Sequence, residues 1–135
     1  MKVLVDTSVW SLALRRRAPA HAAVDELRRL LAAGRAAMIG PIRQELLNGL
    51  RDAVVSDRLR DHLRAFPDEP VERIDYERAA EHFNICRAAG IQGSNTDFLI
   101  CAVAERHAMP ILTTDADFSR YASLLPVELH RIHLP

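Results

Sequence analysis

Several acidic residues in this sequence stand where carboxylates could hold a divalent cation. The stretch ILTTDADF, residues 111–118, ends an apolar segment with Asp115 and Asp117. Asp6 likewise follows the apolar opening MKVLV. All-oxygen ligands suit Mg2+ or Mn2+, and such a cation can activate a water molecule against a phosphate ester. The chemistry that these residues suggest is therefore metal-assisted phosphoryl transfer.

Each acidic residue also has a simpler interpretation when it is taken alone. An aspartate between a strand and a helix, such as Asp6, commonly caps the helix. The segments Ser94–Asp97 and Thr114–Asp117 have the form of a capping box, in which the acidic residue satisfies backbone N–H groups. Glu45 alone fits a solvated helix position. Singly, none of these residues indicates catalysis.

Taken together, the carboxylates call for a positive charge among them, because neighbouring carboxylates repel one another and acquire raised pKa values. Lysine cannot supply that charge, since Lys2 is the only lysine in the chain. The basic residue nearest in sequence is Arg43, two positions before Glu45. A hard divalent cation would meet the need.

The predicted elements alternate between strands and helices. We expect strands at 1–5, 36–40, 71–74, 111–113 and 127–132, and helices at 8–16, 20–33, 41–50, 52–65, 76–89, 95–108 and 118–125. This order predicts an α/β fold with a central, mainly parallel sheet of about five strands flanked by helices. In such sheets the functional crevice lies beyond the carboxyl ends of the strands. All four carboxylate-bearing segments should meet at that edge.

Length and composition place the chain among ordinary globular proteins. At 135 residues and 49% hydrophobic content we expect a single domain over 1–135. Cys86 and Cys101 lie in apolar helical patterns and predict buried thiols. We see no signal peptide or membrane-spanning stretch, so the expectation is a cytoplasmic protein with no membrane partner.

The net charge is +0 from 18 basic and 18 acidic residues, which argues neither for nor against a nucleic-acid partner. If about five carboxylates face a cation, the remaining surface carries an excess of roughly five positive charges. Almost all the basic residues are arginines, which suit phosphate groups through bidentate hydrogen bonds.

The motifs VDTSVW, QELLNG, TDFLICAVA and ILTTDADF resemble, in order and approximate spacing, those of PIN-domain ribonucleases, most closely the VapC-type toxins of toxin–antitoxin systems. The resemblance runs nearly from end to end. It implies an acidic quartet that binds Mg2+, with Mn2+ as a substitute. The implied quartet consists of Asp6, Glu45, Asp97 and Asp115.

The resemblance also implies supporting residues, an activity and partners. Asp117 matches an additional acidic residue, and Thr7, Ser8 and Thr114 match hydroxyl positions beside the quartet. The implied activity is endonucleolytic cleavage of RNA by a metal-activated water, leaving 5'-phosphate and 3'-hydroxyl ends. The implied partners are an antitoxin protein and a second copy of the chain in a homodimer.

Two further features each have two interpretations. The run Arg15, Arg16 and Arg17 could contact an RNA backbone, or it could be a solvated helix end where positive charge is favourable. Trp10 could cover a partner surface, or it could belong to the core.

Two other classes of enzyme or signalling domain fit the sequence less well than a nuclease. A phosphoacceptor receiver domain needs a late lysine near its acidic pocket, which this sequence lacks. A haloacid-dehalogenase-like phosphatase needs the motif D-x-D-x-T, which the run from Asp6 to Trp10 does not meet. A PIN-like module that binds RNA or protein without catalysis remains the alternative.

Overall fold

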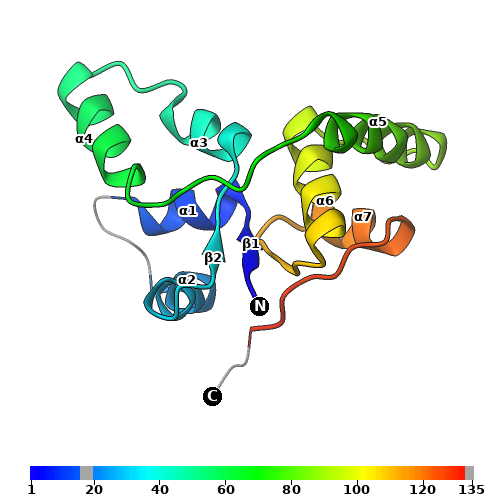
Figure 1. Cartoon of the computed structure of the whole chain (residues 1–135), viewed down its shortest axis with the longest axis horizontal. Helices are drawn as coiled ribbons and strands as arrows, with labels where there is room; N and C mark the ends of the chain where they lie inside the picture. Colours follow the sequence, from blue (N-terminus) through cyan, green and yellow to red (C-terminus); the bar gives the residue numbers. More distant parts are fainter. Residues whose placement is uncertain (16–19, 133–135) are drawn as a thin grey trace.

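A short parallel sheet forms the centre of the molecule (Figure 1). The structure is a computed structural model that describes residues 1–15 and 20–132. Within these residues the sheet has three strands in the order β2-β1-β3, with bounds β1 Val3–Val5, β2 Ala36–Ala37 and β3 Ile111–Leu112. Both neighbours run parallel to β1, with Leu4 opposite Ala37 on one side and Ile111 on the other. The expected parallel α/β architecture is confirmed.

The prediction of about five strands is wrong for the described residues. The expected strand at 127–132 forms only a single parallel bridge between Ile111 and Leu129. The expected strand at 36–40 shortens to β2, followed by one bridge between Met38 and Asp68. The expected strand at 71–74 runs into a helix instead.

Seven helices surround the sheet in the part of the chain that the structure describes. Their bounds are α1 Thr7–Ala13, α2 Ala22–Ala32, α3 Gly40–Leu47, α4 Ala53–Leu63, α5 Arg73–Ala88, α6 Asn95–His107 and α7 Asp117–Leu124. In Figure 1, α1 to α4 lie on the β2 side of the sheet and α5 to α7 on the β3 side. None of the described helices is long and apolar enough to cross a membrane.

The core forms around β1 and α6. All three residues of β1 are fully buried. Every residue of α6 from Phe98 to Ala104 is also buried, which confirms the nearly continuous apolar pattern of that segment. Cys86 and Cys101 are buried free thiols, as expected. This packing fixes the start of α6 next to the carboxyl end of β1.

The helix α5 begins three residues earlier than predicted, which removes the expected strand. Its N-terminal turn is closed by Asp75, whose carboxylate accepts a hydrogen bond of 2.9 Å from the backbone N–H of Glu72. Asp75 is buried and also accepts 2.7 and 2.8 Å hydrogen bonds from Arg106 of α6. The apolar residues of VERI are spaced three apart, which suits one face of a helix as well as a short strand. The ion pair with α6 selects the helix.

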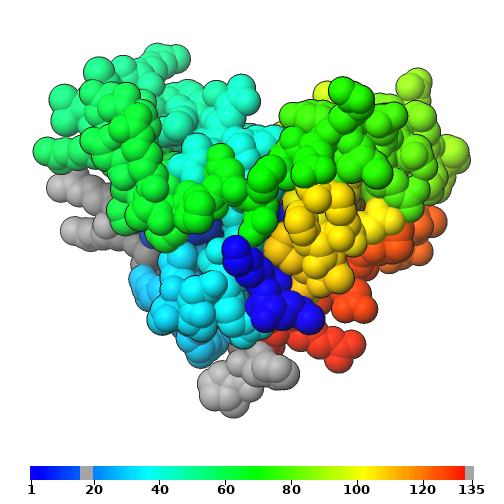
Figure 2. Space-filling view, viewed as in Figure 1, coloured from blue at the N-terminus to red at the C-terminus, as the bar shows by residue number. Residues whose placement is uncertain are grey.

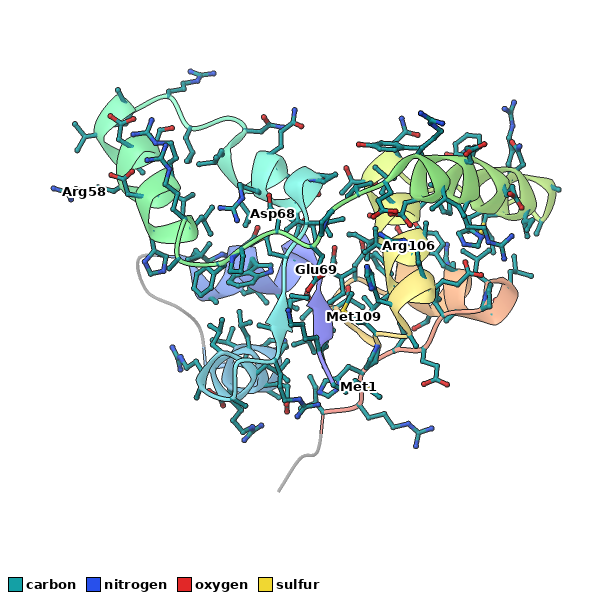
Figure 3. The ribbon with its side chains drawn as sticks, viewed as in Figure 1. Met1, Arg58, Asp68, Glu69, Arg106 and Met109 are labelled. Atoms are coloured by element: carbon teal, nitrogen blue, oxygen red, sulfur yellow. The ribbon has the colours of Figure 1, made fainter. Side chains whose placement is uncertain are left out.

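The segment between α4 and α5 crosses the front of β2 (Figure 3). Its residues Asp68 and Glu69 pair with Arg43 of α3 and with Lys2, at 2.7 and 2.8 Å. Arg43 also donates to the backbone carbonyls of Leu63 and Phe66. Arg43 therefore holds this crossing segment against α3.

Candidate active site

Asp6 lies at the carboxyl end of β1, buried and held by neutral donors. It is 4% exposed, and its Oδ2 accepts hydrogen bonds from the hydroxyls of Ser8 at 2.7 Å and Thr113 at 2.8 Å. Burial raises the pKa of Asp6, and these hydrogen bonds offset only part of the rise. Asp6 occupies the N-cap position of α1 but makes no capping hydrogen bond of regular geometry. The simple capping interpretation does not hold for Asp6.

Glu45 reaches the same edge from α3. The hydroxyl of Thr7, the first residue of α1, donates to Oε1 of Glu45 at 2.7 Å. Glu45 is exposed, yet its side chain is tied to the residue that follows Asp6. The structure therefore brings Glu45 to the carboxyl end of β1 rather than leaving it as an isolated surface residue.

Asp97 lies in the first turn of α6, as predicted. Ser94 is the N-cap of this helix and accepts a hydrogen bond of 3.1 Å from the N–H of Asp97. The Oδ2 of Asp97 accepts a 2.8 Å hydrogen bond from the hydroxyl of Tyr121 in α7. Burial raises the pKa of Asp97, and the negative charges of Asp6 and Asp115 raise it further. Asp97 thus lies within electrostatic reach of two carboxylates from distant segments.

The turn after β3 gives Asp115 and Asp117 different positions. The Oδ1 of Asp115 accepts a hydrogen bond of 2.9 Å from the N–H of Asp117, and so fixes the start of α7. Asp117 is the first residue of α7 and lies 4.0 Å from Arg120, on the outside of the helix. The capping-box interpretation of Thr114–Asp117 does not match this geometry, because the turn-forming hydrogen bond is accepted by Asp115.

The hydroxyl contact made after β3 comes from Thr113 rather than from Thr114. Thr113 donates to Asp6 and accepts from the N–H of Asp115 at 2.9 Å. Thr114 is exposed, and its backbone N–H donates to Ser8 Oγ at 3.1 Å. Thr113 directly follows the buried strand β3, and that position was the only signal in the sequence that could have favoured it.

No cation of the protein neutralises these carboxylates within the described residues. None of the ion pairs there includes Asp6, Glu45, Asp97 or Asp115. The nearest basic residue in the sequence, Arg43, is turned toward Asp68. Uncompensated acidic groups that share one edge fit a hard divalent cation.

The same carboxylates do not form a closed ligand cage. Among residues 1–15 and 20–132, no group of three or more acidic, histidine or cysteine side chains is arranged as ready-made metal ligands. Mg2+ commonly keeps several water molecules and binds few protein carboxylates directly. The donor set therefore fits an open site for a hydrated divalent cation better than an all-protein cage.

The surface above the strand ends is notched. Figure 2 shows the indentation between the segments of α3 and α5, above the carboxyl ends of the strands seen in Figure 1. A separate cavity of about 340 Å3 lies between α5 and α6, and none of the four candidate carboxylates lines it. The exposed side chain of Glu45 and the notch above the strand ends leave the acidic edge accessible from solution.

The remaining candidates separate into core and surface. Trp10 is 2% exposed and donates from Nε1 to the carbonyl of Val5 at 3.1 Å, so it belongs to the core. Arg15 is exposed just after α1. Arg16 and Arg17 lie outside the described residues.

Fold and site together define a class of protein. It is a parallel α/β domain that carries acidic residues from four segments at the carboxyl edge of its sheet. The sequence profile of the PIN domain matches residues 3–124 of this chain. Ribonuclease VapC11 of Mycobacterium tuberculosis is 37% identical over 126 residues, which cover 90% of this chain and 92% of that protein. The chain therefore belongs to the PIN-domain family and is a homologue of the VapC ribonucleases.

Solved structures share the fold at lower identity. FitAcB from Neisseria gonorrhoeae superposes with a TM-score of 0.77 and 22% identity, over 98% of this chain and 99% of that one. VapBC-5 from Mycobacterium tuberculosis is a member of the VapBC family of toxin–antitoxin systems. It superposes with a TM-score of 0.68 and 19% identity, over 97% of this chain and 98% of that one. These likenesses extend the agreement in fold over almost the whole chain.

Proposed function

We propose that the chain is a Mg2+-dependent endoribonuclease that acts as the toxin of a toxin–antitoxin pair. The observation that carries the proposal is the gathering of uncompensated carboxylates at the strand ends, where the negative charges of Asp6 and Asp115 raise the pKa of Asp97. The relative VapC11 is named a ribonuclease. VapBC-5, which shares the fold, belongs to a family of toxin–antitoxin systems.

The residues proposed to hold Mg2+, or Mn2+ in its place, are Asp6, Glu45, Asp97 and Asp115. A divalent cation at such a site supplies Lewis-acid chemistry, since it lowers the pKa of water and neutralises charge on a phosphate. Neutral hydroxyls orient two of the ligands, because Ser8 and Thr113 donate to Asp6 and Thr7 donates to Glu45. These donors hold the carboxylates without cancelling their negative charge.

Glu45 differs from the other carboxylates in its exposure. Oε1 of Glu45 accepts from Thr7, while the side chain as a whole faces solvent. We propose that Glu45 would also orient a water molecule, because an exposed carboxylate can accept a proton from water. The buried Asp6 lacks that access.

The proposed partners are RNA, a cognate antitoxin and a second copy of the chain. Clustered arginines give salt-sensitive affinity for a phosphate backbone without reading its sequence. Arg15, Arg16 and Arg17 are the proposed backbone contacts, and Arg15 is exposed as that role requires. Asp117, close to Asp115 in the turn, is proposed to add negative charge at the edge of the site.

The test is RNA cleavage by the protein purified free of any antitoxin. With structured RNA and Mg2+ or Mn2+ we expect cleavage that EDTA abolishes. Asp97→Asn keeps the size of the side chain and removes its charge. We expect at least about a hundredfold slower cleavage, because loss of a residue that only orients a metal ligand already lowers metal affinity or activity ten- to hundredfold.

The matched control is Asp25→Asn, which removes an exposed carboxylate of α2 that pairs with Arg28 on the surface. This variant should cleave at the rate of the unaltered protein. Equal cleavage by Asp97→Asn would point to another site or to a contaminating nuclease. No cleavage of any RNA by the unaltered chain would favour a PIN-like binding module.

A further inference from the structure

Tyr121 of α7 contacts the acidic edge, the part of the sheet edge that carries Asp6, Glu45, Asp97 and Asp115. Tyr121 was not among the residues predicted for the site. Its hydroxyl donates to Oδ2 of Asp97 at 2.8 Å, and the residue is fully buried. The carbonyl of Gln92 lies at 3.5 Å from the same hydroxyl, the long limit of a hydrogen bond. A phenol carries one proton, so the shorter contact to Asp97 is the one that receives it.

The ring of Tyr121 is held on several sides by other aromatic rings. The rings of Phe98 and Phe118 lie 5.1 Å from it, centre to centre, and both residues are buried. Phe98 directly follows Asp97 in α6. Because the ring cannot turn without displacing these neighbours, its hydroxyl defines one position for Oδ2 of Asp97.

Gly93 leaves the space that Tyr121 occupies. A Cβ atom at this position would lie 2.5 Å from the hydroxyl oxygen of Tyr121, 2.9 Å from its ring and 2.8 Å from the ring of Phe98. Real side chains do not approach so closely, and both rings are buried. A residue other than glycine at position 93 must therefore displace the Tyr121 ring, the Phe98 ring or its own backbone, and we expect the contact between Tyr121 and Asp97 to be disturbed.

Tyr121 also connects two of the acidic segments. Asp115 fixes the start of α7 through the N–H of Asp117, and Tyr121 lies one turn further along the same helix. The position of Asp97 is thereby coupled to the turn that carries Asp115. The short helix α7 therefore links the position of Asp115, after β3, to the position of Asp97 in α6.

We propose that Tyr121 is a positioning residue for the metal site, which sets the orientation of Asp97, and that Gly93 is glycine to make room for it. This inference rests on the proposed function, in which Asp97 is a ligand. Partners that orient a metal ligand typically contribute ten- to hundredfold to metal affinity or activity.

The experiment is a Mn2+ titration of the full chain by isothermal calorimetry, together with RNA cleavage kinetics. Tyr121→Phe keeps the ring and removes only the hydroxyl. We expect about tenfold weaker Mn2+ binding and a lower kcat, with KM for RNA unchanged, because the change concerns the ligand and not the RNA contacts. The matched control is Tyr76→Phe, since Tyr76 is the other tyrosine of the chain and is 55% exposed. Its Mn2+ affinity should equal that of the unaltered protein.

Gly93→Ala provides a second, independent variant. It should weaken Mn2+ binding by a similar factor although residue 93 carries no ligand. Gly40→Ala is its control, because a Cβ at position 40 meets nothing closer than 3.8 Å. If Gly93 acts through Tyr121, the double variant Gly93→Ala/Tyr121→Phe should bind Mn2+ no more weakly than the weaker of the two single variants.

Unchanged Mn2+ affinity of Tyr121→Phe would overturn the inference. A lower melting temperature of this variant in EDTA, with unchanged Mn2+ affinity, would give Tyr121 a merely structural role and would overturn it as well. Failure of the proposed function looks different. In that case the unaltered protein binds Mn2+ and responds to Tyr121→Phe, but cleaves no RNA.

Discussion

Three neutral hydroxyl groups hold the carboxylates of Asp6 and Glu45 at the strand ends. Ser8 and Thr113 donate to Asp6, and Thr7 donates to Glu45. Arginine or lysine in these places would satisfy the carboxylates more strongly but would also cancel their charge. Hydroxyl donors keep the oxygens in place while leaving the negative charge for a cation. The neutrality of these donors therefore favours a metal site.

Thr113 makes two contacts at this edge, and its removal should be costly. In Thr113→Val the buried carboxylate of Asp6 loses one donor, and the N–H of Asp115 loses its acceptor. We expect about tenfold slower RNA cleavage, since a hydrogen bond to a charged group contributes roughly 1.5 kcal/mol or more. The measurement is kcat at saturating Mg2+.

Thr114→Val is the matched comparison for this prediction, because it makes the same replacement one residue further on. Its side chain is exposed, so the loss of rate should be smaller. A larger loss for Thr114→Val than for Thr113→Val would contradict the orienting role of Thr113.

The sequence indicated the acidic residues of the site but not the residues that orient them. Asp6 and Asp97 stand out because each falls where a strand ends or a helix begins. Residues 113 and 114 are both threonine, and only the exact end of β3 decides which of the two hydroxyls faces Asp6. Tyr121 belongs to the apolar face of α7 and is indistinguishable from a core residue until its hydroxyl is seen against Asp97.

At the scale of elements, α5 and α6 are joined by buried and half-buried charges. Asp75 of α5 pairs with Arg106, and Arg78 pairs with Glu105 at 2.9 Å. Burial raises the pKa of Asp75, but the hydrogen bonds from Arg106 and from the N–H of Glu72 outweigh burial, so the pKa lies below its ordinary value. These pairs set the position of α6 and therefore of its first turn, which carries Asp97.

Breaking the pair between Asp75 and Arg106 should destabilise the fold strongly. Arg106→Met keeps much of the length of the side chain but leaves the carboxylate of Asp75, which is 1% exposed, without its partner. We expect a loss of about 3 kcal/mol in the free energy of unfolding, the lower end for a broken buried pair, because Arg106 itself is partly exposed. Urea denaturation measures this loss.

Arg28→Met serves as the control, because Arg28 pairs with Asp25 on the exposed face of α2. Surface pairs of this kind contribute less than about 1 kcal/mol. Similar losses for the two variants would mean that the pair between α5 and α6 contributes no more than a surface contact.

The order of the helices was predictable from periodicity, whereas the strands were predicted less well. The predicted helices at 20–33 and 52–65 correspond to α2 and α4 with ends that differ by one or two residues. Two strands have only two residues each, too few for a period to be recognised. The second half of the segment 71–74 is helical because Arg106 pairs with Asp75, and Arg106 lies about thirty residues away in the sequence, beyond the reach of local patterns.

For the whole molecule, the acidic edge is a cost to folding when no cation is bound. Burial raises the pKa of Asp6 and of Asp97, so the folded chain holds these protons more tightly than the unfolded chain does. The stability that a raised carboxyl pKa contributes is present at low pH. It is lost as the pH rises from the ordinary value of 3.8 through the raised value in the folded state.

Asp97→Asn should therefore stabilise the metal-free protein at neutral pH, because asparagine cannot ionise. In EDTA we expect its melting temperature to exceed that of the unaltered protein at about pH 7, and the difference to shrink as the pH falls toward about 4. Carboxyl groups with lowered pKa values, such as that of Asp75, act in the opposite direction but are common to both proteins. A difference that grows as the pH falls would contradict the assignment.

Trp10 gives these experiments an optical signal. It is the single tryptophan of the chain, lies four residues after Asp6 and is buried with its indole N–H bonded to β1. Its ring also packs 5.3 Å from that of Phe66, in the segment that follows α4. Fluorescence emission from this one indole therefore reports on the strand that carries the acidic edge, without any attached dye, and shifts to longer wavelength when that strand meets water.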